Sequence, residues 1–156
     1  GGPVAWSVVS DGRFKKNIKN DVPGIEFISK LNPVTYNFDQ EALNDFMNVP
    51  DSLRDRNQST QDFNVLKTGF IAQEVEQAAK ECGFEFSGVD APKNENDYYG
   101  LRYAEFVVPL VKATQEQQTI IESQEQKIEE QDQRINSLEK QIQDMQVILE
   151  KLQSGD

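Results

Sequence analysis

The sequence predicts an α+β protein: a small mixed domain of short strands and helices, followed by a long C-terminal helix in a parallel coiled coil. Two observations support this fold class. Isoleucine and leucine recur every seven residues over the last part of the chain. Before them, short alternating or β-branched segments are interspersed with short helical patterns and turn residues. A length of 156 residues suits one ordinary domain with an extended element.

Composition excludes several classes of function. The net charge of −11 argues against a nucleic-acid partner or an anionic membrane surface, and no apolar run reaches the ~18–20 residues of a membrane span. No signal peptide is visible, so we expect synthesis in the cytoplasm. Histidine is absent and Cys82 is the single cysteine, which excludes an intrachain disulfide, a Cys/His zinc site and a Ser-His-Asp triad. We expect no metal and no cofactor; a catalytic base would be a lysine or a carboxylate.

The N-terminal stretch admits two interpretations. Residues 4–9 are β-branched and aromatic, which predicts a strand that ends at the Ser10-Asp11-Gly12 turn. The cations that follow are typical of a solvated edge. Alternatively, Ser10 is a nucleophile and Lys15, five residues downstream, is its base. The residues of this stretch alone leave both interpretations open.

The next segments predict a helix, a strand and a surface excursion. Residues 21–31 carry apolar side chains at spacings of three, with Asp21 or a neighbour as the cap and Pro23 in the first turn, which indicates a short helix. Residues 34–38 alternate apolar with polar and predict a strand. Residues 39–66 are mostly polar, and we expect a long surface excursion with one helical turn at most.

The segments after this excursion return to regular patterns. Residues 68–71 predict a short strand that leads into a helix over 72–82, whose apolar stripe ends at a glycine. On that stripe Cys82 is typical of a small core residue. Residues 84–86 predict another strand, and residues 87–100 a loop.

The final helix carries the clearest periodicity. Two series, at heptad positions a and d, predict its core: Ile121, Gln124, Ile128, Gln131, Ile135, Leu138, Ile142, Met145, Leu149 and Leu152. In a parallel arrangement Lys127 pairs with Asp132 of the next chain, and Arg134 with Glu139. Glutamine at the upper d positions leaves the number of chains open. Pro109 must lie within the first turn or two of this helix or kink it.

Five blocks of sequence in a fixed order resemble a known family. They are 10–18 (SDGRFKKNI), 31–36 (LNPVTY), 68–75 (TGFIAQEV), 99–103 (YGLRY) and Pro109-Leu110, followed by the heptads. This series resembles the endosialidase-type C-terminal intramolecular chaperone domain of phage tail spikes and tail fibres, also found in bacterial surface proteins and in the myelin regulatory factor. The resemblance extends from about Val8 to the end of the chain.

The resemblance implies a homotrimer that assembles an upstream β-rich fibre of the same polypeptide and then releases itself by autoproteolysis. Carried over, the scissile bond is Val9–Ser10, Ser10 is the nucleophile, Lys15 is the general base and Asp11 orients the turn or a cation. The chain would be a single-turnover serine peptidase with a Ser-Lys dyad and no external substrate. Its parent would sit on a phage virion or a bacterial cell surface.

The implied organisation has three parts. Residues 1–9 end the fibre, residues 10–103 form the chaperone domain with 39–66 as an insertion, and residues 104–156 form the helix and trimeric coiled coil. An alternative is a structural cap that trimerises the fibre and stays attached, without cleavage.

Two physical constraints apply to the proposed dyad. Five extended residues span up to roughly 17 Å, so either Asp11-Gly12 folds Lys15 back or the lysine comes from another subunit. A free lysine, with a pKa of ~10.4, is almost wholly protonated at neutral pH, and burial favours its neutral form. We therefore expect cleavage to depend on assembly.

Overall fold

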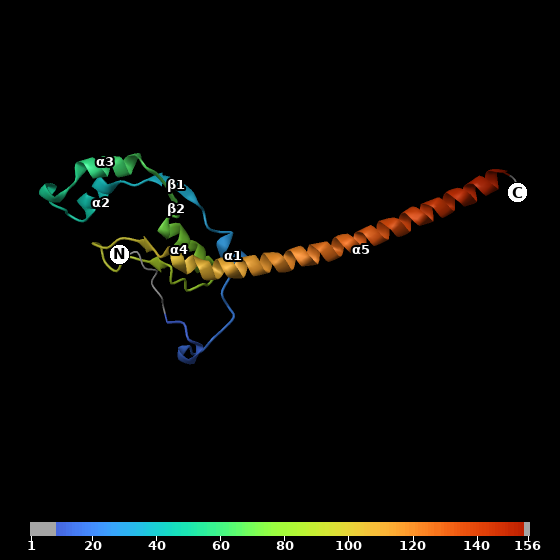
Figure 1. Cartoon of the computed structure of the whole chain (residues 1–156), viewed down its shortest axis with the longest axis horizontal. Coiled ribbons are helices and arrows are strands. Elements are labelled where there is room, and N and C mark those ends of the chain that lie inside the picture. The colour runs from blue at the N-terminus through green and yellow to red at the C-terminus, as the bar shows by residue number, and fades with distance from the viewer. Residues whose placement is uncertain (1–8, 155–156) are drawn as a thin grey trace.

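The computed structural model describes residues 9–154 as a small body from which one long helix projects (Figure 1). This helix, α5 (Val107–Ser154), crosses the body with its first turns and then continues alone as a gently curved rod. Pro109 lies in its first turn, as predicted, where the missing N–H costs nothing. No helix in the described part of the chain is long and apolar enough to cross a membrane.

The core of the body is aromatic. Phe27 is fully buried on α1 (Ile25–Ile28), and Val75 is buried on α4 (Ala72–Glu81), where the predicted apolar stripe is confirmed. Phe106, on the 3₁₀ turn η3 (Tyr103–Phe106) that leads into α5, completes the cluster. The Phe86 ring links α1 to η3, with ring centroids 5.0 Å from Phe27 and 4.8 Å from Phe106. At the end of α4, Gly83 has a φ of +60°, which glycine adopts without strain.

Two short antiparallel ribbons flank this core. The first pairs β1 (Val34–Asn37) with β2 (Leu66–Gly69), in a register that runs from Val34 opposite Gly69 to Asn37 opposite Leu66. The prediction for 34–38 is confirmed, and the strand predicted at 68–71 begins two residues earlier. The second ribbon pairs β3 (Val89–Asp90) with β4 (Gly100–Leu101) within the predicted loop.

The strand predicted at residues 84–86 is wrong. The Phe84 N–H bonds the Ala79 carbonyl at 2.9 Å, and the Phe86 N–H bonds the Phe84 carbonyl at 2.9 Å. These local bonds use the donors that a strand would need for a ladder. Both rings instead pack into the core.

The excursion predicted at residues 39–66 is also wrong as to its structure. It forms α2 (Gln40–Phe46), η2 (Asp51–Leu53) and α3 (Arg56–Asn64). These elements follow β1 and precede β2 in the chain, and together they form an arm that lies away from the α5 rod (Figure 1). The Asp39 carboxylate caps α2 by accepting the Ala42 N–H at 2.9 Å. Arg54 bonds the Asp45 carboxylate at 2.6 Å and the Val49 carbonyl at 2.8 Å. Helix caps and ion pairs order this arm. Because these interactions are polar, no apolar periodicity in the sequence indicates the helices.

The helix predicted over 21–31 exists but is reduced to α1, a single turn. Its N-cap is Gly24, which has no side chain to offer, so the predicted cap at Asp21 is wrong. The strand predicted at 4–9 lies outside the described residues except for Val9, which belongs to no strand.

Candidate functional site

A 3₁₀ turn brings Ser10 and Lys15 together within one chain. In η1 (Gly12–Phe14) the Phe14 N–H bonds the Asp11 carbonyl at 3.1 Å, and the Lys15 N–H bonds the Gly12 carbonyl at 3.2 Å. The chain thereby reverses, and Lys15 Nζ donates a hydrogen bond to Ser10 Oγ at 2.9 Å. Of the two ways to bridge five residues, this chain adopts the folded-back one.

The Asp11 side chain holds the turn through Arg13. Its carboxylate accepts the Arg13 N–H at 2.9 Å, which caps η1, and pairs with the Arg13 guanidinium at 2.6 Å. The hydrogen bonds from Arg13 hold the pKa of the Asp11 carboxyl below its ordinary value. The Arg13 guanidinium is therefore paired with Asp11 within the turn.

The hydrogen-bonded Ser10–Lys15 pair is open to solvent in the single chain. Ser10 and Lys15 are exposed, and the segment around them leaves the body as a loop (Figure 1). Large apolar side chains beside the dyad are exposed as well: Val9 by 80%, and Phe14 and Ile18 by 72% each. Exposed apolar side chains near one another in the sequence mark a candidate interaction surface.

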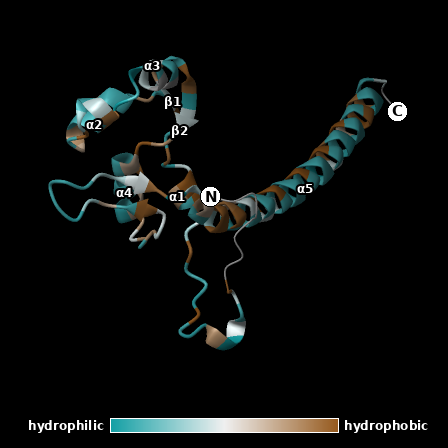
Figure 2. Ribbon diagram, turned by 60° about the vertical axis from the view of Figure 1, so that its left-hand side comes forward, coloured by the Kyte–Doolittle hydropathy of each residue, from teal (hydrophilic) through white to brown (hydrophobic). Residues whose placement is uncertain are grey.

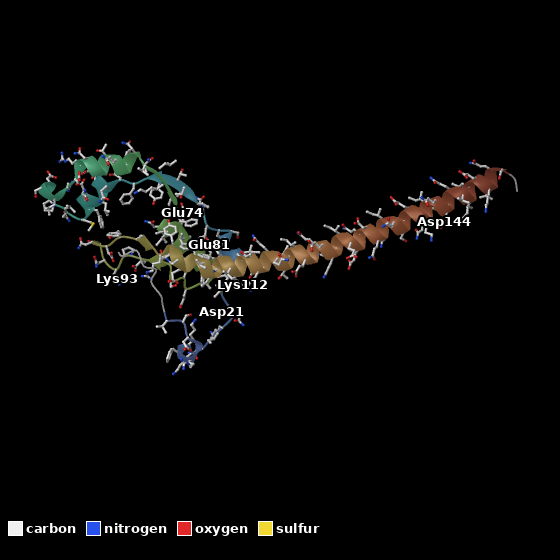
Figure 3. The ribbon with its side chains drawn as sticks, viewed as in Figure 1. Asp21, Glu74, Glu81, Lys93, Lys112 and Asp144 are labelled. Carbon is white, nitrogen blue, oxygen red and sulfur yellow. The ribbon has the colours of Figure 1, made fainter. Side chains whose placement is uncertain are left out.

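The loop returns to the body along the first turns of α5. Lys19, Asn20 and α5 line a groove whose apolar wall is formed by Val22, Val108 and Val111. Asp21 and Lys112 line a second, polar hollow, and Figure 3 shows them near each other where α5 crosses the body. The loop is thus attached next to the base of the rod.

The predicted heptad core lies on one continuous helix and faces solvent. In the single chain about half of each isoleucine in the series is exposed, for example 57% of Ile128. Figure 2 shows hydrophobic residues recurring along the otherwise hydrophilic rod. The same spacing continues back to Val107 and Leu110, which are also exposed. The seam, meaning the a and d positions from Val107 to Leu152, therefore begins beside the body.

Sequence reasoning missed the contact that joins the loop to α5. The Glu116 carboxylate accepts the Ile25 N–H at 2.8 Å, although the two residues are 91 positions apart. Nothing in the local pattern around either residue indicates this pairing. The sequence indicates only that a partner is needed, since Gly24 leaves the N-terminus of α1 without a side-chain cap.

Comparison with known protein families now bears on this site. Residues 10–84 match the family model described as the chaperone of endosialidase, which is labelled as a peptidase family. The match begins at Ser10, the first residue of the hydrogen-bonded pair. Residues 10–84 form an endosialidase chaperone-type domain.

The endosialidase chaperone domain therefore covers η1, the aromatic core up to Phe84 and the inserted arm. The family's description indicates a chaperone role. Searches of curated proteins and of solved structures gave no match to the chain.

Proposed function

We propose that this chain is an intramolecular chaperone that trimerises an upstream fibre or spike and then cuts itself free at the Val9–Ser10 bond. The observation that carries the proposal is the hydrogen bond between Lys15 Nζ and Ser10 Oγ at the first residue of the matched domain. The client is the β-rich fibre that precedes Ser10 in the same polypeptide. Its location is a phage virion or a bacterial surface.

The chemistry needs only this chain and water. Neutral Lys15 Nζ takes the Ser10 hydroxyl proton while Oγ attacks the Val9 carbonyl carbon. The Val9–Ser10 C–N bond breaks, the freed Ser10 amine receives that proton from Lys15, and Val9 is held as an ester on Oγ. Water then attacks the ester, which leaves a Val9 carboxylate and restores the serine hydroxyl. Each product carries a new terminus, and no second turnover follows.

Assembly supplies what the single chain lacks. Burial disfavours the charged form of a lysine, and Lys15 is exposed in one chain. We propose that neighbouring subunits cover Val9, Phe14 and Ile18 when the seams associate, and that this burial activates the dyad. Cleavage then follows trimerisation and releases only a finished fibre.

Mass spectrometry of the purified chain with its client tests the reaction. The expected result is a fragment that begins at Ser10, lost in Ser10→Ala and in Lys15→Ala and retained in Lys16→Ala, the matched control for charge. A single intact mass in well-formed trimers after long incubation would instead establish the non-cleaving cap.

Mixed trimers of Ser10→Ala and Lys15→Ala chains test the source of the base. The hydrogen bond within one chain predicts that they do not cleave, because no subunit holds both groups. Recovered cleavage would mean that the lysine acts across subunits. Analytical ultracentrifugation of Ser10→Ala distinguishes three chains from two, which the heptad pattern leaves open.

A further inference from the structure

We infer that Glu116 is a positioning residue for self-cleavage: it holds the start of α1, and with it the end of the Ser10–Lys15 loop, against the base of the coiled-coil helix. This inference rests on the proposed function and adds to it the physical link between assembly and the dyad. It starts from the hydrogen bond from the Ile25 N–H to Glu116 Oε2, at 2.8 Å.

This hydrogen bond satisfies the Ile25 N–H, which the N-cap residue of α1 cannot cap with a side chain. The first N–H groups of a helix lack partners within it, and Gly24, the N-cap of α1, has no side chain. A carboxylate is the stronger kind of acceptor for such a donor. Lys112 Nζ lies 3.4 Å from the other oxygen of Glu116, one turn away on α5, and holds the carboxylate in place.

Close packing reinforces this contact. Gly24 is buried so near α5 that a methyl group on it would lie 2.7 Å from the Ala113 nitrogen and 2.5 Å from Glu116 Oε2. Phe27 on α1, and Pro109 and Ala113 on α5, are also buried. Glycine is therefore required here, because only its backbone allows this approach.

The contact occupies a different face of α5 from the seam. Phe106, Pro109, Ala113 and Glu116 follow one another at helical spacing and face the body, whereas Val107 and Leu110 at the start of the seam are exposed. Between Lys15 and this anchor, residues 16–21 are all exposed. The segment from Ser10 to Gly24 is thus attached at its C-terminal end to the same turns of α5 on which the seam begins. Association of the helices through the seam would therefore place this segment of each chain at a subunit boundary.

The test compares cleavage rates within isolated trimers. We expect Glu116→Ala to slow cleavage by about tenfold or more, because lost positioning lowers the population of the reactive arrangement. Glu116→Gln keeps an acceptor oxygen and should restore most of the rate. The matched control is Glu130→Ala, which removes the same charge two heptads further along the rod, where the side chain is exposed.

A second measurement does not depend on cleavage. In a Ser10→Ala background the Ile25 amide should exchange its hydrogen slowly, and Glu116→Ala should make it exchange faster while the trimer and its thermal midpoint are retained. Gly24→Ala should have the same effect through steric exclusion. Wild-type trimers that fail to cleave would refute the proposed function. Wild-type trimers that cleave while Glu116→Ala cleaves equally fast, or shows unchanged Ile25 exchange, would refute the positioning role alone.

Discussion

The body and the rod use apolar side chains in opposite ways. In the body Phe27, Val75 and Phe106 are buried by contacts from the same chain, at 0%, 1% and 4% exposure. On the rod the isoleucines of the seam remain about half exposed, as Ile128 illustrates. The body therefore completes its core alone, whereas under the proposed association the rod obtains its core from other copies of the chain.

The largest expected effect is on association. Ile135→Asp places a charge in the middle of the proposed seam, and desolvating a carboxylate in every subunit is strongly unfavourable. We expect loss of the trimer in sedimentation velocity, with the circular dichroism of the body's aromatic residues retained. Gln133→Asp, on an outward heptad position of the same turn, should remain trimeric. A trimer that survived Ile135→Asp would show that subunits meet elsewhere.

The next largest effect is on the stability of the body. Phe27→Ala removes a fully buried ring, and such changes cost about 3–5 kcal/mol of unfolding free energy. Chemical denaturation followed by aromatic circular dichroism measures this cost. Phe14→Ala is the control, since its ring is largely exposed in one chain and should change the monomer's stability by no more than about 0.5 kcal/mol. Equal effects of the two substitutions would contradict the assignment of the core.

A smaller, local effect is expected in the arm. Asp39→Ala removes the cap of α2 and should destabilise that helix by about 1 kcal/mol, whereas Asp39→Asn keeps the acceptor oxygen. Hydrogen exchange of the Ala42 amide reports the change. Acceleration in the asparagine variant as large as in the alanine variant would argue against the cap.

The smallest effect is a pH dependence at the edge of the body. Hydrogen bonds from Lys30 and Gln77 hold the pKa of Glu81 below its ordinary value. A lowered carboxyl pKa adds stability above the unfolded value, ~4.3, and that stability is lost as the pH falls through the folded value. The stability difference between wild type and Glu81→Gln should therefore be present at pH 7 and shrink at acid pH. It should be small at every pH because the pair is solvent-exposed. A stability difference that grew as the pH fell would contradict a lowered pKa of Glu81 in the folded protein.

Sequence reasoning succeeded where a structure depends on spacing along the chain. The apolar stripe of α4, the alternation of β1 and the position of Pro109 are local patterns, and each is confirmed. It failed at the arm, where polar caps and the ion pairs of Arg54 order helices that bury few apolar groups. It also failed at residues 84–86, whose backbone donors are taken by carbonyls close by in the chain.

The candidate site divides in the same way. By itself the sequence determined which residues to consider, Ser10 and Lys15 in an ordered series of motifs, and the period of the seam, because motif order and heptad spacing are properties of a linear chain. Only the tertiary structure decided that η1 turns Lys15 back onto Ser10 and that Glu116 reaches the Ile25 N–H. Backbone reversal is set by local dihedral angles and caps, and a contact across 91 residues forms only when packing brings the two segments together.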